Sequence, residues 1–185
     1  MADRPTLEDR LRRVRLLLTD VDGVLTDGRI AKLPNGDELK FFSIYDGFGI
    51  RLAQKHGIEV GFVSGRKSRQ VSARAAELDV KLVLQGVPDK LGALESICRE
   101  RKLGPEDVGY VGDDLPDIRL LLRAGFSAAP ANAVDAVKDA VSYVARTRGG
   151  AGVLREVIEL ILRAQGKGDA ILREYGLDTP ANPVE

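Results

Sequence analysis

The sequence predicts an α/β fold built on a doubly wound, mostly parallel β-sheet. Short apolar runs alternate along the chain with longer segments of helical periodicity. Three of these runs end at side chains suited to chemistry, at Asp20, Ser64 and Asp113. Strands that alternate with helices form parallel sheets, and such sheets bind ligands at the carboxyl ends of their strands. We therefore expect the three residues to meet at one edge of the sheet.

Composition is typical of one globular domain over residues 1–185, since 44% of the residues are hydrophobic. The 28 basic and 28 acidic residues cancel, so net charge favours neither nucleic acid nor a membrane surface as a partner. A single cysteine, Cys98, has the helical phase of a core residue and indicates a reducing compartment. The first residues are polar and no apolar run approaches 18 residues, so we expect a cytoplasmic protein with no membrane segment.

The first elements frame a β-hairpin. Residues 1–14 show helical spacing and predict a short leading helix, and residues 15–19 form an apolar strand. Residues 28–43 contain an Asn-Gly turn between two extended runs, which is typical of a hairpin. A hairpin of this size cannot bury itself, so it should lie over the site or pair with another subunit. A helix over 47–55, closed by a glycine, and a buried strand over 58–63 follow.

The middle of the chain repeats the strand and helix alternation. Apolar residues at helical spacing predict helices over 68–78 and 89–101, with a short strand over 81–84 between them. A Gly-Pro break precedes the strand over 108–111, which ends at an acidic turn. A helix over 115–123 follows that turn.

The last elements complete the predicted sheet. A short strand over 126–128, a helix over 134–140 and a strand over 141–144 come first. An amphipathic helix over 153–164 and a short helix over 169–175 follow. The C-terminal tail, taken as 148–185, opens with a glycine-rich stretch, and its last residues, 179–185, carry two prolines and should be loosely held.

Two carboxylates one residue apart follow the first strand, at Asp20 and Asp22. Alternate residues of a strand point to the same side, and a bend at Gly23 would let one acid attack a phosphorus atom while the other faces the departing oxygen. A calcium-binding loop is excluded because two of its ligand positions would fall on Val24 and Ala31. A plain turn after a strand stays open on this stretch alone.

The parts needed for hydrolysis of a phosphate monoester are all present. Asp20 can attack, and Asp22 can protonate the leaving group and then activate water. Ser64, with backbone N–H groups before a helix, can bind phosphoryl oxygens, and Lys90 can neutralise phosphate and nucleophile. Taken singly, Ser64 would more often be a helix cap and Lys90 a solvated lysine. Their ordered appearance after successive strands favours the catalytic interpretation.

A Mg²⁺ ion would be held by hard oxygen ligands. The predicted shell is the Asp20 carboxylate, the Asp22 backbone carbonyl, Asp113 and waters, with Asp114 and Asp117 holding those waters. Two stretches resemble nucleotide-binding motifs but match them only in part. The stretch that begins at Gly61 departs from a Walker A loop because Arg66 stands in place of its second glycine, and Gly47-Phe48-Gly49 lacks the third glycine of a dinucleotide-binding turn.

These motifs together resemble those of the haloacid dehalogenase-like phosphatases. The matching segments are Asp20-Val21-Asp22-Gly23, Ser64-Gly65, Lys90, and Gly112-Asp113-Asp114 with Asp117. More narrowly, the chain is similar from about Arg15 to Gly168 to the 3-deoxy-D-manno-octulosonate 8-phosphate phosphatase family. The segments that carry this likeness are Asp20 to Gly28, Tyr45 to Arg51, Ser64 to Lys67, Gln85-Gly86 and Arg148 to Glu156.

The resemblance implies a Rossmann-like core without a large cap, Mg²⁺ as cofactor and a homotetramer assembled through the hairpins. It also implies that the glycine-rich tail reaches a neighbouring subunit's site. The implied activity is hydrolysis of a phosphorylated sugar acid for lipopolysaccharide synthesis, through an aspartyl-phosphate on Asp20. The implied substrate-binding residues are Asp22, Ser43, Ile44, Tyr45, Asp46, Gly47, Arg51, Arg66, Arg74 and Lys90. Several cations suit a substrate that carries both carboxylate and phosphate.

Two departures from the family pattern bear on the substrate. Tyr45 stands where the family commonly has arginine, and Ala151 stands where it often has a basic residue. Related nine-carbon sugar-acid phosphatases tend to have an acid where Arg66 stands, which favours the eight-carbon substrate. The alternatives are a nonulosonate 9-phosphate phosphatase and a non-catalytic tetramerisation module. A phosphomutase would need a larger cap than the hairpin provides.

Overall fold

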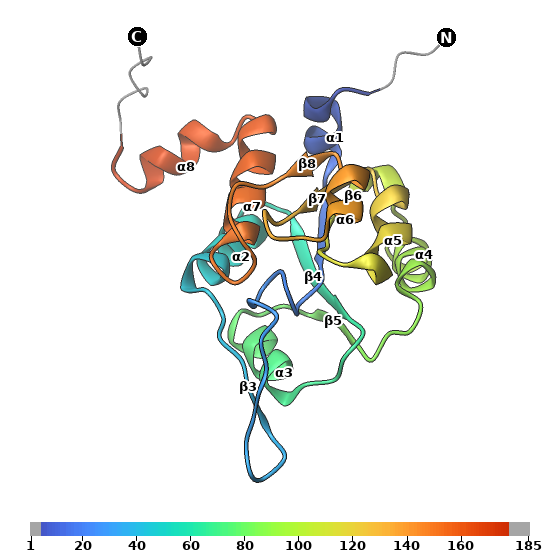
Figure 1. Ribbon diagram of the computed structural model, residues 1–185. Helices are drawn as coiled ribbons and strands as arrows, with labels where there is room; N and C mark the ends of the chain where they lie inside the picture. Colours follow the sequence, from blue (N-terminus) through green and yellow to red (C-terminus); the bar gives the residue numbers. More distant parts are fainter. Residues whose placement is uncertain (1–4, 178–185) are drawn as a thin grey trace.

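The computed structural model of the chain describes residues 5–177 and contains one six-stranded sheet whose neighbouring strands are all parallel (Figure 1). In spatial order the strands are β5 (Leu82–Gln85), β4 (Glu59–Ser64), β1 (Leu16–Thr19), β6 (Val108–Val111), β7 (Phe126–Ala129) and β8 (Tyr143–Val144). Strand β1, the first in the sequence, lies between β4 and β6, so the strand order reverses there. Ligand sites of doubly wound sheets lie at this kind of switch point. The predicted α/β fold is confirmed.

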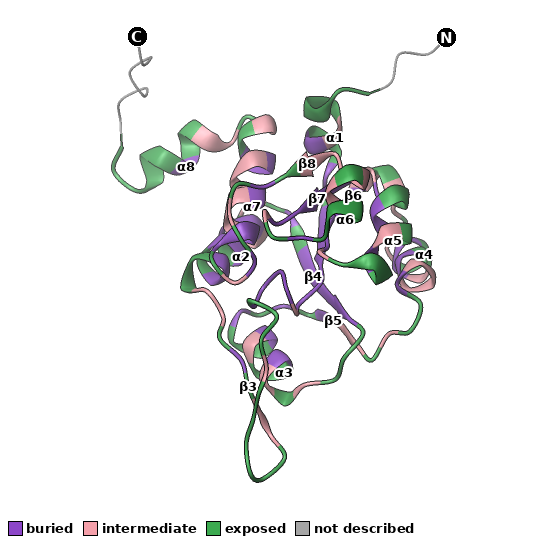
Figure 2. Cartoon of the chain, viewed as in Figure 1, coloured by how far each residue is buried: buried purple, intermediate pink, exposed green. Residues whose placement is uncertain are grey.

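Helices cover both faces of the sheet, and each face has its own apolar core. The helices that pack on the first core are α1 (Leu7–Arg13), α2 (Ile44–Lys55), α3 (Arg69–Glu77), α7 (Val153–Ala164) and α8 (Gly168–Glu174). Those of the second core are α4 (Lys90–Arg101), α5 (Ile118–Arg123) and α6 (Asp135–Ala140). Cys98 is buried in this second core, as its helical phase predicts. The inner strands β1, β6 and β7 are wholly buried between the two layers, as is β4 apart from its first residue, whereas the edge strands β5 and β8 are partly exposed (Figure 2).

Two predicted helices differ from the observed ones for local reasons. Helix α2 begins at Ile44, three residues earlier than expected, because the Ser43 hydroxyl accepts a hydrogen bond from the Tyr45 backbone N–H and caps the helix. The segment expected as one helix over 115–123 is a 3₁₀ turn (Leu115–Asp117) followed by α5. Asp114 caps that turn by accepting the Leu115 N–H at 2.7 Å.

The predicted hairpin is confirmed, with short strands β2 (Ala31–Lys32) and β3 (Glu38–Leu39) that form a separate two-stranded sheet. It interrupts the alternation of strands and helices between β1 and α2. Much of the hairpin is exposed (Figure 2), including the large apolar side chain of Phe41, which is 72% exposed. No helix of the described chain has the length and apolarity needed to cross a bilayer. The segment 179–185, expected to be loosely held, lies outside the described residues.

Candidate active site

The three predicted strand-end residues are brought to one edge of the sheet. Asp20 directly follows β1, Ser64 is the last residue of β4, and Asp113 lies two residues after β6. Because β4 and β6 pair with β1 on either side, their carboxyl ends are adjacent. The Asp20 backbone N–H donates to the Val111 carbonyl at 2.9 Å and continues the ladder into the loop. The expectation that distant parts of the chain meet here is confirmed.

Lys90 lies at the first turn of α4 and reaches into a buried cluster of acids. Its Nζ donates to Asp20 Oδ1 at 2.8 Å and to Asp117 Oδ1 at 2.6 Å, and lies 3.3 Å from the Tyr110 hydroxyl. Lys90, Asp20 and Asp117 are all buried. A buried ammonium of this kind is held in place by its anionic partners. The lysine is therefore fixed beside the residue expected to attack phosphorus.

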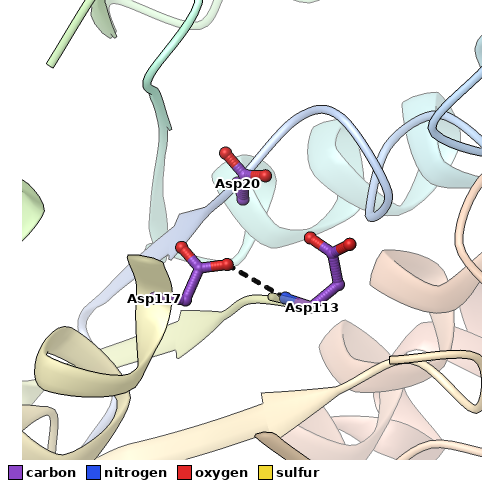
Figure 3. A group of neighbouring side chains, drawn as sticks. All are labelled: Asp20, Asp113 and Asp117. Carbon is purple, nitrogen blue, oxygen red and sulfur yellow. Dashed lines mark hydrogen bonds between the residues drawn. The ribbon is translucent and has the colours of Figure 1, made fainter. Parts of the chain in front are cut away.

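Three carboxylates share this cluster with that one lysine. Oxygen atoms of Asp20, Asp113 and Asp117 lie within 4.8 Å of one another (Figure 3). Burial raises the pKa of Asp20 to about 6, against the opposing charge of Lys90. Burial, together with the charges of Asp20 and Asp117, raises the pKa of Asp113 to about 7. The cluster therefore carries more negative charge than Lys90 can balance.

The excess charge and the oxygen donors fit a divalent cation. Asp113 Oδ1 is buried and has no hydrogen-bond partner among the described residues, so an acceptor is left for an ion. Carboxylate oxygens are the ligands that Mg²⁺ prefers. The cluster includes Asp20 and Asp113 of the predicted shell. It adds Asp117, which we had expected to hold only waters.

Gly23 is required for this arrangement. Its φ of +104° is one that side chains rarely tolerate, and a Cβ there would lie 2.0 Å from Asp113 Oδ2. The glycine thus lets the loop after β1 approach the loop after β6. This gives a steric reason for the glycine that follows the two acids.

Sequence reasoning missed Tyr110, which lies in β6 and is fully buried. Its hydroxyl donates to Asp117 Oδ1 at 2.5 Å, while Asp117 Oδ2 accepts the backbone N–H groups of Asp113 and Asp114 at 3.1 and 3.3 Å. Asp117 therefore orients Lys90 and the acidic turn together. The only available signal was a tyrosine within a buried strand, whose hydroxyl must find a partner. Asp114 is exposed and caps its own turn.

We predict that Tyr110→Phe lowers kcat by about tenfold with little change in KM, because Asp117 would hold Lys90 less firmly. The lost hydrogen bond to a charged group should also reduce the free energy of unfolding by about 2 kcal/mol. Steady-state kinetics and chemical denaturation measure the two effects. Tyr143→Phe is the matched control, since that hydroxyl bonds Glu156 instead. Equal kcat losses in both variants would contradict the assignment.

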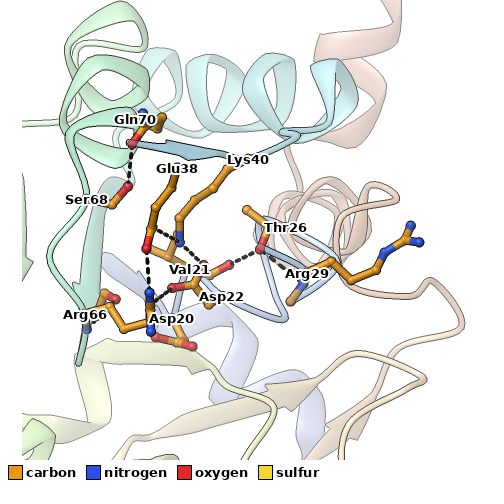
Figure 4. A network of polar contacts seen from close by, with 12 residues as sticks. Asp20, Val21, Asp22, Thr26, Arg29, Glu38, Lys40, Arg66, Ser68 and Gln70 are labelled. Carbon is orange, nitrogen blue, oxygen red and sulfur yellow. Dashed lines mark hydrogen bonds and ion pairs between the residues drawn. The ribbon is translucent and has the colours of Figure 1, made fainter. Parts of the chain in front are cut away.

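The second predicted acid, Asp22, lies in a separate cluster of charges (Figure 4). Lys40 Nζ of the hairpin donates to Asp22 Oδ1, and Arg66 Nε lies 3.7 Å from Asp22 Oδ2. Arg66 Nη2 also donates to Glu38 Oε1 at 2.7 Å. The Ser64 hydroxyl accepts the Arg66 backbone N–H at 3.1 Å, which ties the strand end to this cluster. The hairpin therefore reaches the site of its own chain.

Among the residues expected to bind substrate, Arg51 and Arg74 make contacts within the chain. Arg74 is mostly buried, donates to the Ser43 carbonyl at 3.2 Å and pairs with Glu77. Arg51 donates to the Glu77 carbonyl at 3.0 Å. Ile44 and Tyr45 are exposed at the start of α2. A Cβ on Gly47 would lie 2.3 Å from the Arg74 guanidinium. Their roles in substrate binding stay predictions.

Asp46 is buried in α2 and accepts the Arg155 backbone N–H at 2.9 Å, where α7 begins. Burial raises the pKa of this carboxyl from 3.8 to about 6. The folded chain thus holds the proton more tightly than the unfolded chain. The group's contribution to stability is full below its unfolded pKa and is lost as pH rises through its folded pKa.

We therefore predict that Asp46→Asn gains stability relative to wild type, by about 2 kcal/mol, on going from about pH 4 to about pH 7. The asparagine keeps an oxygen for the Arg155 N–H but carries no charge to bury. Denaturant unfolding at each pH measures the difference, with the exposed Asp139→Asn as control. A difference that does not change with pH would contradict the prediction.

The glycine-rich stretch before α7 supports the acidic loop of its own chain. The Gly150 N–H donates to the Val24 carbonyl at 2.8 Å, and the Gly149 N–H donates to Asn132 Oδ1 at 2.8 Å. A Cβ on Gly149 would lie 1.8 Å from the Gly23 carbonyl oxygen. Only a residue without a side chain allows this contact. The predicted reach of this stretch to a neighbouring subunit is not tested by a single chain.

Comparison with known proteins points to one family. Residues 83–157 match the family described as haloacid dehalogenase-like hydrolase. The 3-deoxy-D-manno-octulosonate 8-phosphate phosphatase of Escherichia coli K12 is 44% identical over 160 residues, which cover 86% of this chain and 85% of that protein. The phosphatase of the same description from Salmonella typhimurium is 42% identical over 165 residues, covering 89% of this chain and 88% of that protein.

Two solved structures of phosphatases with this description are also similar to the chain. The Moraxella catarrhalis 3-deoxy-D-manno-octulosonate 8-phosphate phosphatase, in complex with magnesium, phosphate and a KDO molecule, has a TM-score of 0.89 and 35% identity, and the match covers 91% of this chain and 97% of that one. The cobalt-bound phosphatase from Haemophilus influenzae has a TM-score of 0.84 and 38% identity, covering 87% of this chain and 94% of that one. Both structures hold a divalent metal.

Proposed function

Because this chain belongs to the 3-deoxy-D-manno-octulosonate 8-phosphate phosphatase family of the haloacid dehalogenase-like hydrolases, we propose that it hydrolyses this sugar phosphate to the free sugar acid and inorganic phosphate. The observation that carries the proposal is the buried contact of Lys90 with Asp20 beside Asp113. A non-catalytic assembly module would have no use for a buried lysine and three clustered acids. Burying such charges costs stability, so a chain that served only for assembly would gain nothing from them.

Mg²⁺ is the cofactor, and we propose Asp20, Asp113 and the Asp22 backbone carbonyl as its protein ligands. The clustered oxygens and the unpartnered Asp113 Oδ1 support this choice. When bound, the ion supplies positive charge that stabilises the phosphoryl oxygens and the developing charge of the transition state. Asp117 is not a ligand in this proposal; it holds the loop that carries Asp113 by accepting the N–H groups of Asp113 and Asp114.

The proposed chemistry has two displacements at phosphorus. An Asp20 carboxylate oxygen forms a bond to phosphorus as the bond to the sugar oxygen breaks, and Asp22 gives its proton to that oxygen. In the second step Asp22 takes a proton from water, the water oxygen bonds to phosphorus, and the bond to Asp20 breaks. Phosphate leaves and both aspartates return to their first state.

Other side chains bind the charges of the substrate. Lys90 lies next to the attacking oxygen and offsets the negative charge that gathers there. We assign phosphoryl contacts to Ser64 at the end of β4. Arg66 lies beside Asp22 and is partly exposed, so the part of its guanidinium that does not donate to Glu38 is available to the substrate carboxylate. The position of Arg66 supports the eight-carbon substrate over a nonulosonate 9-phosphate.

Assembly and location are further proposals. We propose a homotetramer assembled through the hairpins, which is supported by the exposed apolar side chains of Leu39 and Phe41 on this element. We also propose that the enzyme works in the cytoplasm, in the synthesis of lipopolysaccharide precursors. The buried free thiol of Cys98 is consistent with a reducing compartment.

A substrate panel tests the proposal. Phosphate release is measured from 3-deoxy-D-manno-octulosonate 8-phosphate, from a nonulosonate 9-phosphate and from simple sugar phosphates, each with Mg²⁺ and with a chelator. We expect the octulosonate to have the highest kcat/KM and the chelator to abolish turnover. Faster turnover of the nonulosonate would overturn the choice of substrate, and no turnover of any phosphate would favour the assembly module.

A further inference from the structure

We propose that Lys40 is a positioning residue for Asp22, which it holds with one carboxyl oxygen paired and the other free to carry the catalytic proton. The inference deepens the proposed phosphatase function and rests on it. Lys40 directly follows β3 in the hairpin, an element outside the sheet that supplies Asp20 and Lys90. No part of the reaction described so far uses this lysine.

The burial of Lys40 is the first observation. Its side chain is 0% exposed, although lysine is among the residues least often buried. Its Nζ donates to Asp22 Oδ1 and lies 3.8 Å from Glu38 Oε2 (Figure 4). An ammonium without exposure to water must be compensated by such anions. Lys40 and Asp22 therefore hold each other in place across 18 residues of sequence.

The two oxygens of Asp22 differ, which is the second observation. Oδ1 accepts a hydrogen bond from Lys40, whereas Oδ2 is buried and has no hydrogen-bond partner among the described residues. Arg66, the other cation beside Asp22, has its Nε 3.7 Å from Oδ2, beyond hydrogen-bond distance, and its Nη2 donates to Glu38 instead. Oδ2 is thus the oxygen available to carry a proton.

The pairing suits both of the roles of Asp22. When Oδ2 carries the proton, Oδ1 still accepts the N–H of Lys40, because a protonated carboxyl keeps an acceptor oxygen. When the proton has gone to the leaving oxygen, the same contact becomes an ion pair with the carboxylate. The carboxyl can therefore stay in one orientation through both displacements, as preorganised catalysis requires.

This role predicts a dependence on the leaving group. A sugar alkoxide needs a proton to depart, whereas 4-nitrophenolate is a weak base and departs without one. The parameter kcat/KM includes steps only up to the first irreversible one, here the transfer of the phosphoryl group to Asp20. A poorly oriented Asp22 should therefore lower kcat/KM for the sugar phosphate far more than for 4-nitrophenyl phosphate.

The experiment compares wild type, Lys40→Met, Lys40→Arg and the control Lys32→Met on both substrates at saturating Mg²⁺. Lys32 is a lysine of the same hairpin that pairs with Glu38, and its side chain is 67% exposed. We expect Lys40→Met to lose about 10²-fold in kcat/KM on the sugar phosphate but less than about tenfold on 4-nitrophenyl phosphate. Lys40→Arg should recover part of the loss, and Lys32→Met should stay close to wild type on both substrates.

Equal losses of kcat/KM on the two substrates would show that Lys40 has only a structural role. No loss of kcat/KM on either substrate would show that it does not position Asp22. Thermal unfolding shows whether each variant folds. Lys40→Gln, which keeps an N–H donor of smaller reach, gives the same comparison of substrates if the methionine variant does not fold. A wild type that turns over neither phosphate overturns the proposed function and the role of Lys40 with it. If wild type is active and Lys40→Met is equally active, the positioning role of Lys40 is overturned but the proposed function is not.

Discussion

Asp20→Asn is expected to lose at least about 10⁴-fold in kcat, because it removes the oxygen that bonds to phosphorus. The amide is nearly the same size as the carboxyl and its oxygen can still accept from Lys90, which Asp117 also holds at 2.6 Å. The fold should therefore survive the change. Phosphate release from 3-deoxy-D-manno-octulosonate 8-phosphate measures the loss, with thermal unfolding to confirm the fold.

Asp139→Asn makes the same chemical change at an exposed site and should keep wild-type activity. An Asp20→Asn enzyme that retained more than about a tenth of wild-type kcat would rule out attack by Asp20. In that case the Asp20 side chain would serve the metal alone, and water would have to attack the substrate directly.

Lys90→Met should have the second large effect, because it should lower both the stability and the activity of the enzyme. The variant leaves the carboxylates of Asp20, Asp113 and Asp117 clustered without their cation. Breaking a buried ion pair from one side costs about 3–5 kcal/mol, and we expect a loss of unfolding free energy of that size in chelator. Loss of the charge beside the attacking oxygen should lower kcat by about 10²- to 10³-fold.

Added Mg²⁺ distinguishes the electrostatic effect from simple loss of packing. A cation bound by Asp20 and Asp113, beside Asp117, should restore more stability to Lys90→Met than it adds to wild type, and thermal unfolding with and without Mg²⁺ measures this difference. Lys138→Met, which removes a partly exposed lysine paired with Asp135, is the control. Equal Mg²⁺ effects in wild type and Lys90→Met would contradict the proposed cluster.

Strand and helix order could be predicted because each element carries its own signal. Apolar runs and helical spacing placed β1, β4 and β6 correctly, and topology then required Asp20, Ser64 and Asp113 to share an edge. The start of α2 was missed by three residues because the Ser43 cap depends on a local hydrogen bond that periodicity does not show.

Contacts between distant side chains could not be predicted in the same way. Tyr110 looked like one more strand residue until its hydroxyl was found on Asp117. Lys40 drew no interpretation from the sequence, yet it is buried against Asp22. Asp46 was assigned to substrate by resemblance, and the contact in which its carboxyl accepts the Arg155 N–H at the start of α7 was not foreseen. Such contacts depend on how loops pack over one another, and no spacing in the sequence encodes that.

Transfer of the phosphoryl group to the chain itself is the most direct test of the account. The enzyme is mixed with a small excess of ³²P-labelled 3-deoxy-D-manno-octulosonate 8-phosphate and Mg²⁺, quenched in acid within milliseconds, and digested. We predict a transient, hydroxylamine-labile label on the peptide that contains Asp20. Turnover without any labelled peptide, or with the label on another residue, would contradict the account.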